Sequence, residues 1–260
     1  MGKYQAAFFD IDNTLYDWKR KQFNLAGIAA IKELKKQGVK VFLASARPYR
    51  SQVEFGAFDL GIHWDGYIAS AGAIAVVGRH TVKKTLMEEK DVRKLCKIAR
   101  KNDLTMEVVT PRTRFLIAPG NTYLESYHGT YSDTVPPIHP YKGGECTGVL
   151  LFAPAFHDAE FQEALPHLTY YRFHDCGVDI MPSEHRKGEG IQAILDYLGL
   201  SKKDAISFGD DTQDITMKDA SFFVCLGNGK DEVKEAADYV TDPIGEDGLA
   251  KALYALGALK

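Results

Sequence analysis

The sequence predicts an α/β protein in which a doubly wound parallel sheet is interrupted by an inserted α+β domain. Strand-like and helix-like segments alternate at both ends of the chain, which is typical of a parallel sheet covered by helices. In the middle, strand-like runs follow one another over short turns, which indicates antiparallel pairing. A chain of 260 residues, 45% of them hydrophobic, can bury the cores of two modest domains. We expect a discontinuous core at residues 1–78 and 184–260, with the insert at residues 79–183.

The N-terminal part of the core starts with a short apolar strand. A second largely apolar run follows at residues 39–44, as expected for a strand buried on both faces. Between them, apolar residues recur at helical spacing, and Gly38 is a natural helix end. In chain order we expect a strand at 6–9, a helix at 24–37, a strand at 39–44, a helix from about 49 to 60 and a strand within 66–74.

The insert has a different pattern, with adjacent strands and two helices. Its first helix is amphipathic, and its strands are separated by turns too short for a crossover helix. The expected helices lie at 89–101 and 157–165, and the expected strands at 104–110, 114–118, 147–153, 169–174 and 178–181.

Alternation resumes after residue 183. A helix at 188–198 ends at Gly199, and further strands are expected at 205–208 and 222–226, followed by a helix at 230–237. The second half of the chain therefore returns to the parallel sheet of the first.

Composition excludes several classes of partner. The formal net charge is −3 with no long run of one sign, so a nucleic-acid partner is not expected. No apolar stretch approaches the roughly 20 residues of a membrane span, and the first apolar run stops at Asp10, unlike a signal peptide. The four cysteines form no CxxC pair, which favours reduced thiols and a cytoplasmic protein. A monomer and a homodimer are both open.

Residues that can bind a cation or a phosphate group follow several of the predicted strands. The carboxyl ends of parallel strands meet at one edge of a sheet, where ligands bind. Acidic side chains there can hold a hard cation, and a hydroxyl or an ammonium group can hold a phosphate. Taken by themselves, the acids after the first strand could instead belong to an ordinary turn, since Asp and Asn favour turns. The residues concerned are Asp10, Asp12, Ser45, Lys187, Asp210, Asp211 and Asp214.

Four short motifs occur in order: residues 10–14 (Asp-Ile-Asp-Asn-Thr), Ser45, Lys187-Gly188 and residues 209–214 (Gly-Asp-Asp-Thr-Gln-Asp). They resemble the DxDxT motif, the second-motif hydroxyl, the basic third motif and the GDxxND motif of the haloacid dehalogenase superfamily. Within it the sequence is similar to the Cof-like phosphatases with a C2-type cap, subfamily IIB. The resemblance implies a Rossmann-like core with an inserted C2B-type α+β cap domain, and the activity of a phosphoric monoester hydrolase.

The resemblance also implies a role for each motif residue. Asp10 would be the nucleophile that forms an aspartyl-phosphate, and Asp12 the general acid and base. Mg²⁺ would be held by the side chains of Asp10 and Asp210 and by the backbone carbonyl of Asp12, with support from Asp214. The phosphoryl group would be bound by Ser45, Ala46, Lys187 and Gln213.

The sequence departs from the family pattern at three positions. Ala46 stands where Gly usually follows the second-motif hydroxyl, and Gln213 stands where Asn usually precedes the last acid. Ala71 occupies a position where such proteins often have Asn. None of these changes removes a residue that the chemistry requires.

The function expected is hydrolysis of a small phosphorylated metabolite, such as a sugar phosphate, which the sequence does not identify. In the insert, Arg112 and Arg114 could reach an anionic end of the substrate, although a solvated surface pair is the simpler interpretation. A phosphomutase and a non-catalytic phosphometabolite sensor are alternatives. A dinucleotide oxidoreductase is disfavoured because no GxGxxG follows the first strand.

Overall fold

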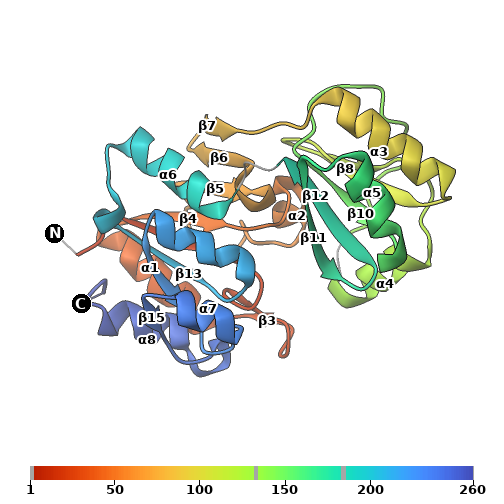
Figure 1. Ribbon diagram of the computed structural model, residues 1–260. Helices are drawn as coiled ribbons and strands as arrows, with labels where there is room; N and C mark the ends of the chain where they lie inside the picture. The colour runs from red at the N-terminus through yellow and green to blue at the C-terminus, as the bar shows by residue number, and fades with distance from the viewer. Residues whose placement is uncertain (1–2, 132–133, 183–185, 260) are drawn as a thin grey trace. The chain divides into compact units, whose positions relative to one another are not determined.

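The computed structural model describes residues 3–131, 134–182 and 186–259, and these fold into two compact units (Figure 1). The first unit, which we call the core, comprises Met1–Arg47, Gly56–Lys83 and Arg186–Lys260. The second, which we call the cap, comprises Pro48–Phe55 and Lys84–His185. The predicted fold class, a parallel-sheet α/β protein with an inserted α+β region, is confirmed.

The core contains an eight-stranded sheet in the order β15-β14-β13-β1-β4-β5-β6-β7. Its strands run parallel from β15 to β5, and β6 is antiparallel to β5. The fully buried β1 lies between β4 and β13, so the motif that follows β1 is central in the sheet. The strands are β1 (Ala6–Phe9), β4 (Lys40–Ala44), β5 (Gly66–Ala69), β6 (Ile74–Val77), β7 (His80–Lys84), β13 (Ala205–Gly209), β14 (Phe222–Cys225) and β15 (Tyr239–Val240).

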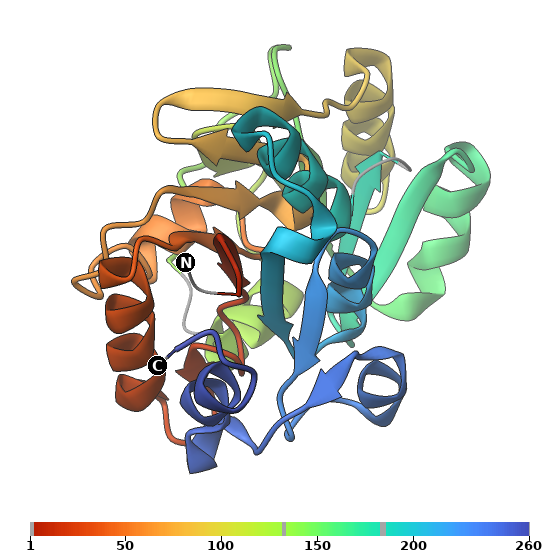
Figure 2. The ribbon, with the colours of Figure 1, turned by 90° about the vertical axis from the view of Figure 1, so that its left-hand side faces the viewer.

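Helices cover both faces of this sheet. On one face, α6 (Lys187–Leu198), the 3-10 helix η4 (Thr212–Asp219) and α7 (Asp231–Ala236) share an apolar cluster with the strands. On the other face, α1 (Leu25–Lys36) and α8 (Gly248–Ala255) lie next to each other (Figure 2). Smaller elements of the core are the hairpin β2 (Tyr16–Asp17) and β3 (Gln22–Phe23), and the 3-10 helices η1 (Ser70–Gly72), η3 (Lys202–Asp204) and η5 (Ile244–Glu246).

The start of α1 illustrates how local sequence sets an element. The side chain of Asn24 accepts a hydrogen bond from the Gly27 N–H at 2.8 Å, which caps the first turn. Gly38, with φ of +87°, follows the last turn and ends the helix where the sequence predicted.

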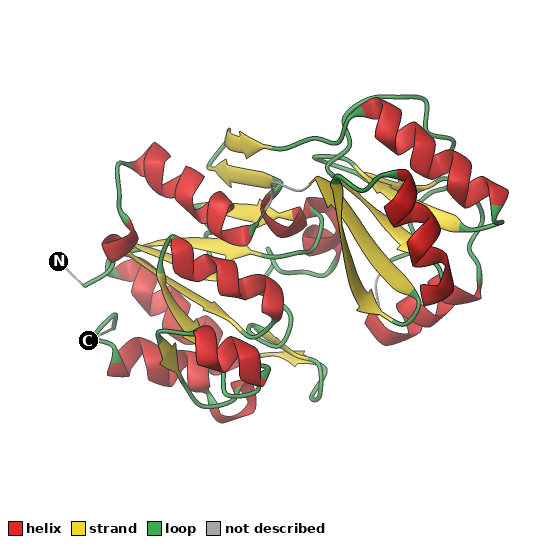
Figure 3. Cartoon of the chain, in the orientation of Figure 1, coloured by secondary structure: helices red, strands yellow, loops and turns green. Residues whose placement is uncertain are grey.

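The cap is built on a five-stranded antiparallel sheet in the order β11-β12-β10-β8-β9 (Figure 3). One face packs against α3 and α5 in a single apolar cluster, and α4 packs on the other face. The elements are α2 (Tyr49–Glu54), α3 (Glu89–Lys101), β8 (Thr105–Val109), β9 (Arg114–Leu116), α4 (Thr122–Tyr131), β10 (Gly148–Phe152), η2 (Ala155–His157), α5 (Asp158–Ala164), β11 (Leu168–His174) and β12 (Gly177–Pro182).

Helix α4 was not predicted from the sequence. Its ten residues include Thr, Ser and Gly, which are weak helix formers, so local propensity gives little signal. Burial of Leu124 and Tyr127 against Phe152 of the sheet stabilises it instead.

The limits of the two units differ from those expected. Gly78, with φ of +57°, lies in the turn that connects β6 to β7, so the core continues past residue 78. The helix expected to reach residue 60 is the shorter α2, which is followed by Gly56 with φ of +80°. This helix groups with the cap, where Glu54 lies 2.7 Å from Arg114. The boundary expected between residues 183 and 184 lies outside the described residues.

Within the described ranges, no helix combines the length and the apolar character that crossing a membrane requires.

Candidate active site

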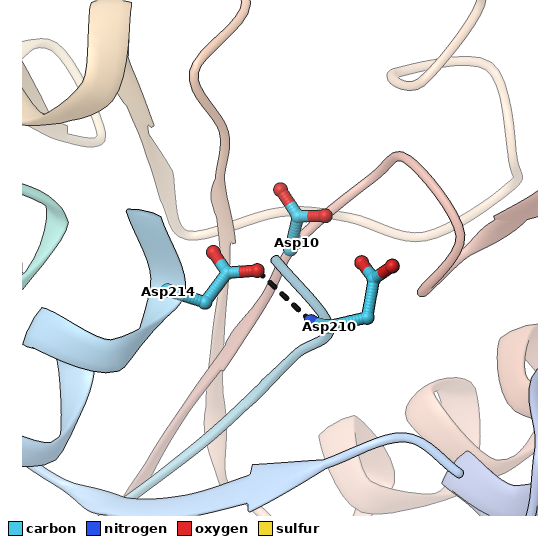
Figure 4. Close-up of side chains that lie close together, drawn as sticks. All are labelled: Asp10, Asp210 and Asp214. Atoms are coloured by element: carbon cyan, nitrogen blue, oxygen red, sulfur yellow. Dashed lines mark hydrogen bonds between the residues drawn. The ribbon is translucent and has the colours of Figure 1, made fainter. Parts of the chain in front are cut away.

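Three aspartates meet at the carboxyl edge of the core sheet (Figure 4). Strands β1 and β13 are paired in parallel with Phe9 opposite Phe208, and the Asp10 N–H donates to the Phe208 carbonyl at 3.0 Å. The residues that follow these strands, Asp10 and Asp210, therefore come close together. The parallel register of two strands, rather than a local turn, brings these two acids to one place.

Asp214 completes the cluster from the first turn of η4. Its Oδ2 accepts the backbone N–H groups of Asp210 at 2.9 Å and Asp211 at 3.0 Å, so the carboxylate folds back over its own loop. A Cβ atom at Gly209 would lie 2.5 Å from this carboxyl group, so a glycine is required there. The loop and the first turn of η4 thus hold Asp214 firmly in place.

Lys187, the first residue of α6, lies between two of these acids. Its Nζ donates to Asp10 Oδ1 at 2.7 Å and to Asp214 Oδ1 at 2.5 Å, and its side chain is only 3% exposed. Burial alone would favour the neutral amine, but the two carboxylates outweigh it and raise the pKa of Lys187. The residue before it approaches η1 closely, since a Cβ at Gly72 would lie 2.1 Å from the Arg186 carbonyl oxygen.

The cluster brings three carboxyl groups together with one ammonium group, so full ionisation of the acids would leave an excess of negative charge. Burial, followed by the neighbouring carboxylates, raises the pKa of Asp210 to about 9. Burial likewise raises the pKa of Asp10, although Lys187 opposes it. Such carboxylates are stabilised in the ionised form by a further cation.

The geometry of the three acids suits a small divalent cation. Oxygen atoms of Asp10, Asp210 and Asp214 lie within 4.8 Å of one another. Around one Mg²⁺ with oxygen ligands at about 2.1 Å, ligand atoms are roughly 3 to 4 Å apart. Thr14 donates a hydrogen bond to Asp210 Oδ1 at 3.3 Å and helps to orient it. This donor set could hold a divalent metal ion with little movement.

Asp12 has different partners. Arg47 donates from Nε to Asp12 Oδ2 and from Nη2 to Oδ1, both at 2.9 Å, and Trp18 donates from Nε1 to Oδ1 at 2.8 Å. Although burial opposes ionisation, the Arg47 guanidinium and these hydrogen bonds lower the pKa of Asp12. Sequence reasoning missed Arg47 and Trp18. The available signal for Arg47 was its place two residues after Ser45, at the same strand end.

The remaining predicted phosphate-binding residues directly follow β4 or lie in η4. Ser45 follows β4 and is fully buried, and its Oγ accepts the Arg47 N–H at 3.1 Å. Ala46 is half-buried between them. Gln213 lies beside Asp214 in η4, and its Oε1 is buried without a hydrogen-bond partner among the described residues. Ala71 adopts the left-handed conformation, with φ of 52°, which Asn tolerates better than Ala.

The two cap arginines lie in contrasting environments. Arg112 is exposed on the turn between β8 and β9. Arg114 is buried, with its guanidinium 3.4 Å from Glu107 and 2.7 Å from Glu54, so it serves first to join α2 to the cap sheet. A substrate contact at either residue stays a prediction, and the ion pairs of Arg114 favour a structural role for it.

Comparison with known proteins agrees with these observations. The model of the haloacid dehalogenase-like hydrolase family matches residues 7–253. The protein named "Putative phosphatase YkrA" of Bacillus subtilis (strain 168) is 31% identical over 257 residues, which cover 97% of this chain and 98% of that one. A crystal structure of a hypothetical protein from Geobacillus kaustophilus has a TM-score of 0.90 at 29% identity, covering 98% of this chain and 100% of that one. The structure of the HAD subclass IIB sugar phosphatase BT4131 has a TM-score of 0.84 at 27% identity, with the same coverage of 98% and 100%. The resemblance predicted from the four motifs is confirmed, and the chain belongs to the haloacid dehalogenase-like hydrolase family.

Proposed function

We propose that this protein is a Mg²⁺-dependent phosphatase that hydrolyses a small phosphorylated metabolite through an aspartyl-phosphate on Asp10. The observation that carries the proposal is the buried carboxylate of Asp10, held 2.7 Å from the Lys187 ammonium and beside two further acids. A carboxylate is a recognised nucleophile for phosphoryl transfer. The ammonium favours the ionised form of Asp10 and so opposes the effect of burial on its pKa.

Asp10, Asp210 and Asp214 would hold the metal ion through carboxylate oxygens, together with the backbone carbonyl of Asp12. When bound, Mg²⁺ offsets the repulsion between the anionic phosphate and the carboxylates. Ser45, the Ala46 N–H, Lys187 and Gln213 bind the oxygens of the phosphoryl group that do not react. Gln213 would contribute through the N–H groups of its side-chain amide, because its carbonyl Oε1 can only accept hydrogen bonds.

The reaction has two steps. First, a carboxylate oxygen of Asp10 attacks phosphorus, the bond to the ester oxygen breaks, and Asp12 donates a proton to that departing oxygen. Second, a water molecule attacks the phosphorus of the aspartyl-phosphate while Asp12 takes a proton from it. The bond to Asp10 breaks, and inorganic phosphate leaves.

A relative of known activity supports the proposed substrate class. BT4131 is a sugar phosphatase, which supports a sugar phosphate or a similar metabolite for this chain. All four cysteines are buried free thiols, which supports the expected location in the reducing cytoplasm.

A panel of phosphorylated metabolites, assayed for phosphate release with Mg²⁺ and with chelator, tests the proposal. Asp10→Asn keeps the shape of the side chain but removes the nucleophile, so turnover and trapping by beryllium fluoride should both be lost. Asp219→Asn, an identical change at an exposed position, should behave as wild type. Substantial turnover by Asp10→Asn contradicts the covalent mechanism. A phosphoryl group found on a second hydroxyl instead of in inorganic phosphate identifies a phosphomutase, and metabolite binding without turnover identifies a sensor.

A further inference from the structure

We infer that η1 (Ser70–Gly72) is a positioning element that holds Lys187 at a fixed place relative to Ser45, so that both can bind one phosphoryl group. The inference rests on the proposed function. Its basis is that η1 contacts both neighbours through the backbone. It donates hydrogen bonds to the segment that carries Ser45, and at Gly72 it leaves room for the peptide bond before Lys187. We call these two sets of contacts the η1 tie.

The first half of the tie joins η1 to the residues that follow β4. The Ser70 N–H donates to the Arg47 carbonyl at 3.0 Å, and the Ala71 N–H donates to the Ser45 carbonyl at 3.2 Å. Two consecutive N–H groups of η1 therefore bind the carbonyl groups on both sides of Ala46. The backbone that carries the Ser45 hydroxyl is fixed to η1 in this way.

The second half of the tie is a close approach between backbone segments at the start of α6. A Cβ atom at Gly72 would lie 2.1 Å from the Arg186 carbonyl oxygen and 3.0 Å from the Lys187 nitrogen. From the other side, a Cβ atom at Gly188 would lie 2.0 Å from the carbonyl oxygen of Thr216 in η4. The start of α6 is thus confined between η1 and η4, and Lys187 cannot move toward either segment without a collision.

The backbone of η1 is itself in an unfavourable conformation. The φ angle is 50° at Ser70, 52° at Ala71 and 107° at Gly72, so three consecutive residues have positive φ. Two of them carry a Cβ atom, which is crowded by the backbone in this conformation. Such residues persist where surrounding contacts impose the conformation, and they are concentrated at functional sites. The two halves of the tie supply contacts of this kind.

Gly72→Ala tests the tie, because the added methyl group must displace the peptide bond before Lys187. The ammonium group then loses its alignment with a phosphate bound at Ser45. Binding of inorganic phosphate with Mg²⁺ present, measured by calorimetry, should weaken by roughly 10–10²-fold, the equivalent of one charge-assisted hydrogen bond. The matched control is Gly38→Ala in the same unit. Gly38 also has a positive φ, of 87°, but an added Cβ there meets nothing within 4 Å, so phosphate affinity should be kept.

A second titration distinguishes positioning from a general loss of structure. Mg²⁺ binding without phosphate depends on the three acids, whose places are set by the pairing of β1 with β13 and by the loop that holds Asp214. Moving the ammonium group away from these acids does not weaken their attraction for a cation. Gly72→Ala should therefore keep its affinity for Mg²⁺ while it loses affinity for phosphate.

Amide hydrogen exchange in the wild-type protein, followed by NMR, gives a test that needs no variant. A phosphate bound by both Ser45 and Lys187 stabilises the tie between them, so local opening of η1 becomes rarer. Inorganic phosphate with Mg²⁺ should slow exchange of the Ser70 and Ala71 N–H groups more than Mg²⁺ alone does. The Gly78 N–H, whose hydrogen bond lies outside the tie, is the reference.

The outcomes are distinct. Loss of phosphate affinity with unchanged Mg²⁺ affinity in Gly72→Ala supports the tie, as does slower exchange at Ser70 and Ala71. Unchanged phosphate affinity in a folded Gly72→Ala overturns the inference, and so does an equal loss of affinity for both ligands. If Gly72→Ala does not fold, the exchange measurement decides, and exchange in η1 that phosphate leaves unchanged overturns the inference. If wild type binds no phosphate and hydrolyses no ester with Mg²⁺, the proposed function itself has failed, and the inference fails with it.

Discussion

Replacing Lys187 by Met removes the ammonium group that lies between two buried carboxylates while keeping an unbranched side chain of similar length. The lysine side chain is 3% exposed, and its partners Asp10 and Asp214 are 6% and 0% exposed. Solvent therefore cannot compensate for the lost ion pairs. We expect a large loss of stability in the core.

The size of the loss follows from this burial. Removing one partner of a buried ion pair costs about 3–5 kcal/mol because a charge is left without compensation. A change of about 1 kcal/mol moves Tm by roughly 2–4 °C in a unit of this size, so Tm should fall by roughly 6–20 °C. The loss of unfolding free energy should be larger at pH 8 than at pH 5, because the carboxylates left without the ammonium can take up protons at the lower pH.

Chemical denaturation in the presence of chelator measures the change. Lys230→Met is the matched control, since Lys230 pairs with Asp211 at 2.8 Å but the two side chains are 53% and 42% exposed. Such an exposed pair contributes about 0–1 kcal/mol. Combining Lys187→Met with Asp10→Asn should restore part of the stability, since one unpaired charge is removed. The reasoning is refuted if Lys187→Met costs no more than Lys230→Met at pH 8.

Three further predictions concern the metal, a glycine and a cap acid. Mg²⁺ at 100 times its Kd should stabilise the core by about 2.7 kcal/mol, and a thermal melt that millimolar Mg²⁺ leaves unchanged contradicts the metal assignment. Gly209→Ala should lower the Tm of the core and weaken the stabilisation by Mg²⁺, because the added methyl group would collide with Asp214. The control is Gly129→Ala in α4, where the added methyl group meets nothing within 4 Å and should raise the free energy of unfolding of the cap by about 0.5–1 kcal/mol. In the cap, burial raises the pKa of Asp179 to about 7, against about 3.9 when unfolded, so stability should fall as pH rises between these values. Asp179→Asn should therefore raise Tm at pH 8 and leave it nearly unchanged at pH 4; equal effects at both pH values would show that the carboxylate is solvated.

Much of the core could be predicted because its signals are local. Apolar runs such as residues 6–9 mark buried strands, and alternation with helices requires parallel neighbours, so the residues after each strand must meet at one edge. Asp10 and Asp210 are adjacent in the structure for this reason. The four motifs in order also identified the family, which the comparison confirmed.

Other features of the site depend on contacts between distant segments. The pairing of Arg47 with Asp12 joins residues 35 positions apart, and neither residue by itself indicates the other. Arg114 looked like a surface residue in the sequence, yet partners at positions 54 and 107 allow it to be buried. Sequence patterns report which face of an element is apolar and where a strand ends. Which side chain neutralises which charge is decided only when the packed elements bring those charges within hydrogen-bond distance, because that choice depends on burial and geometry that no single segment contains.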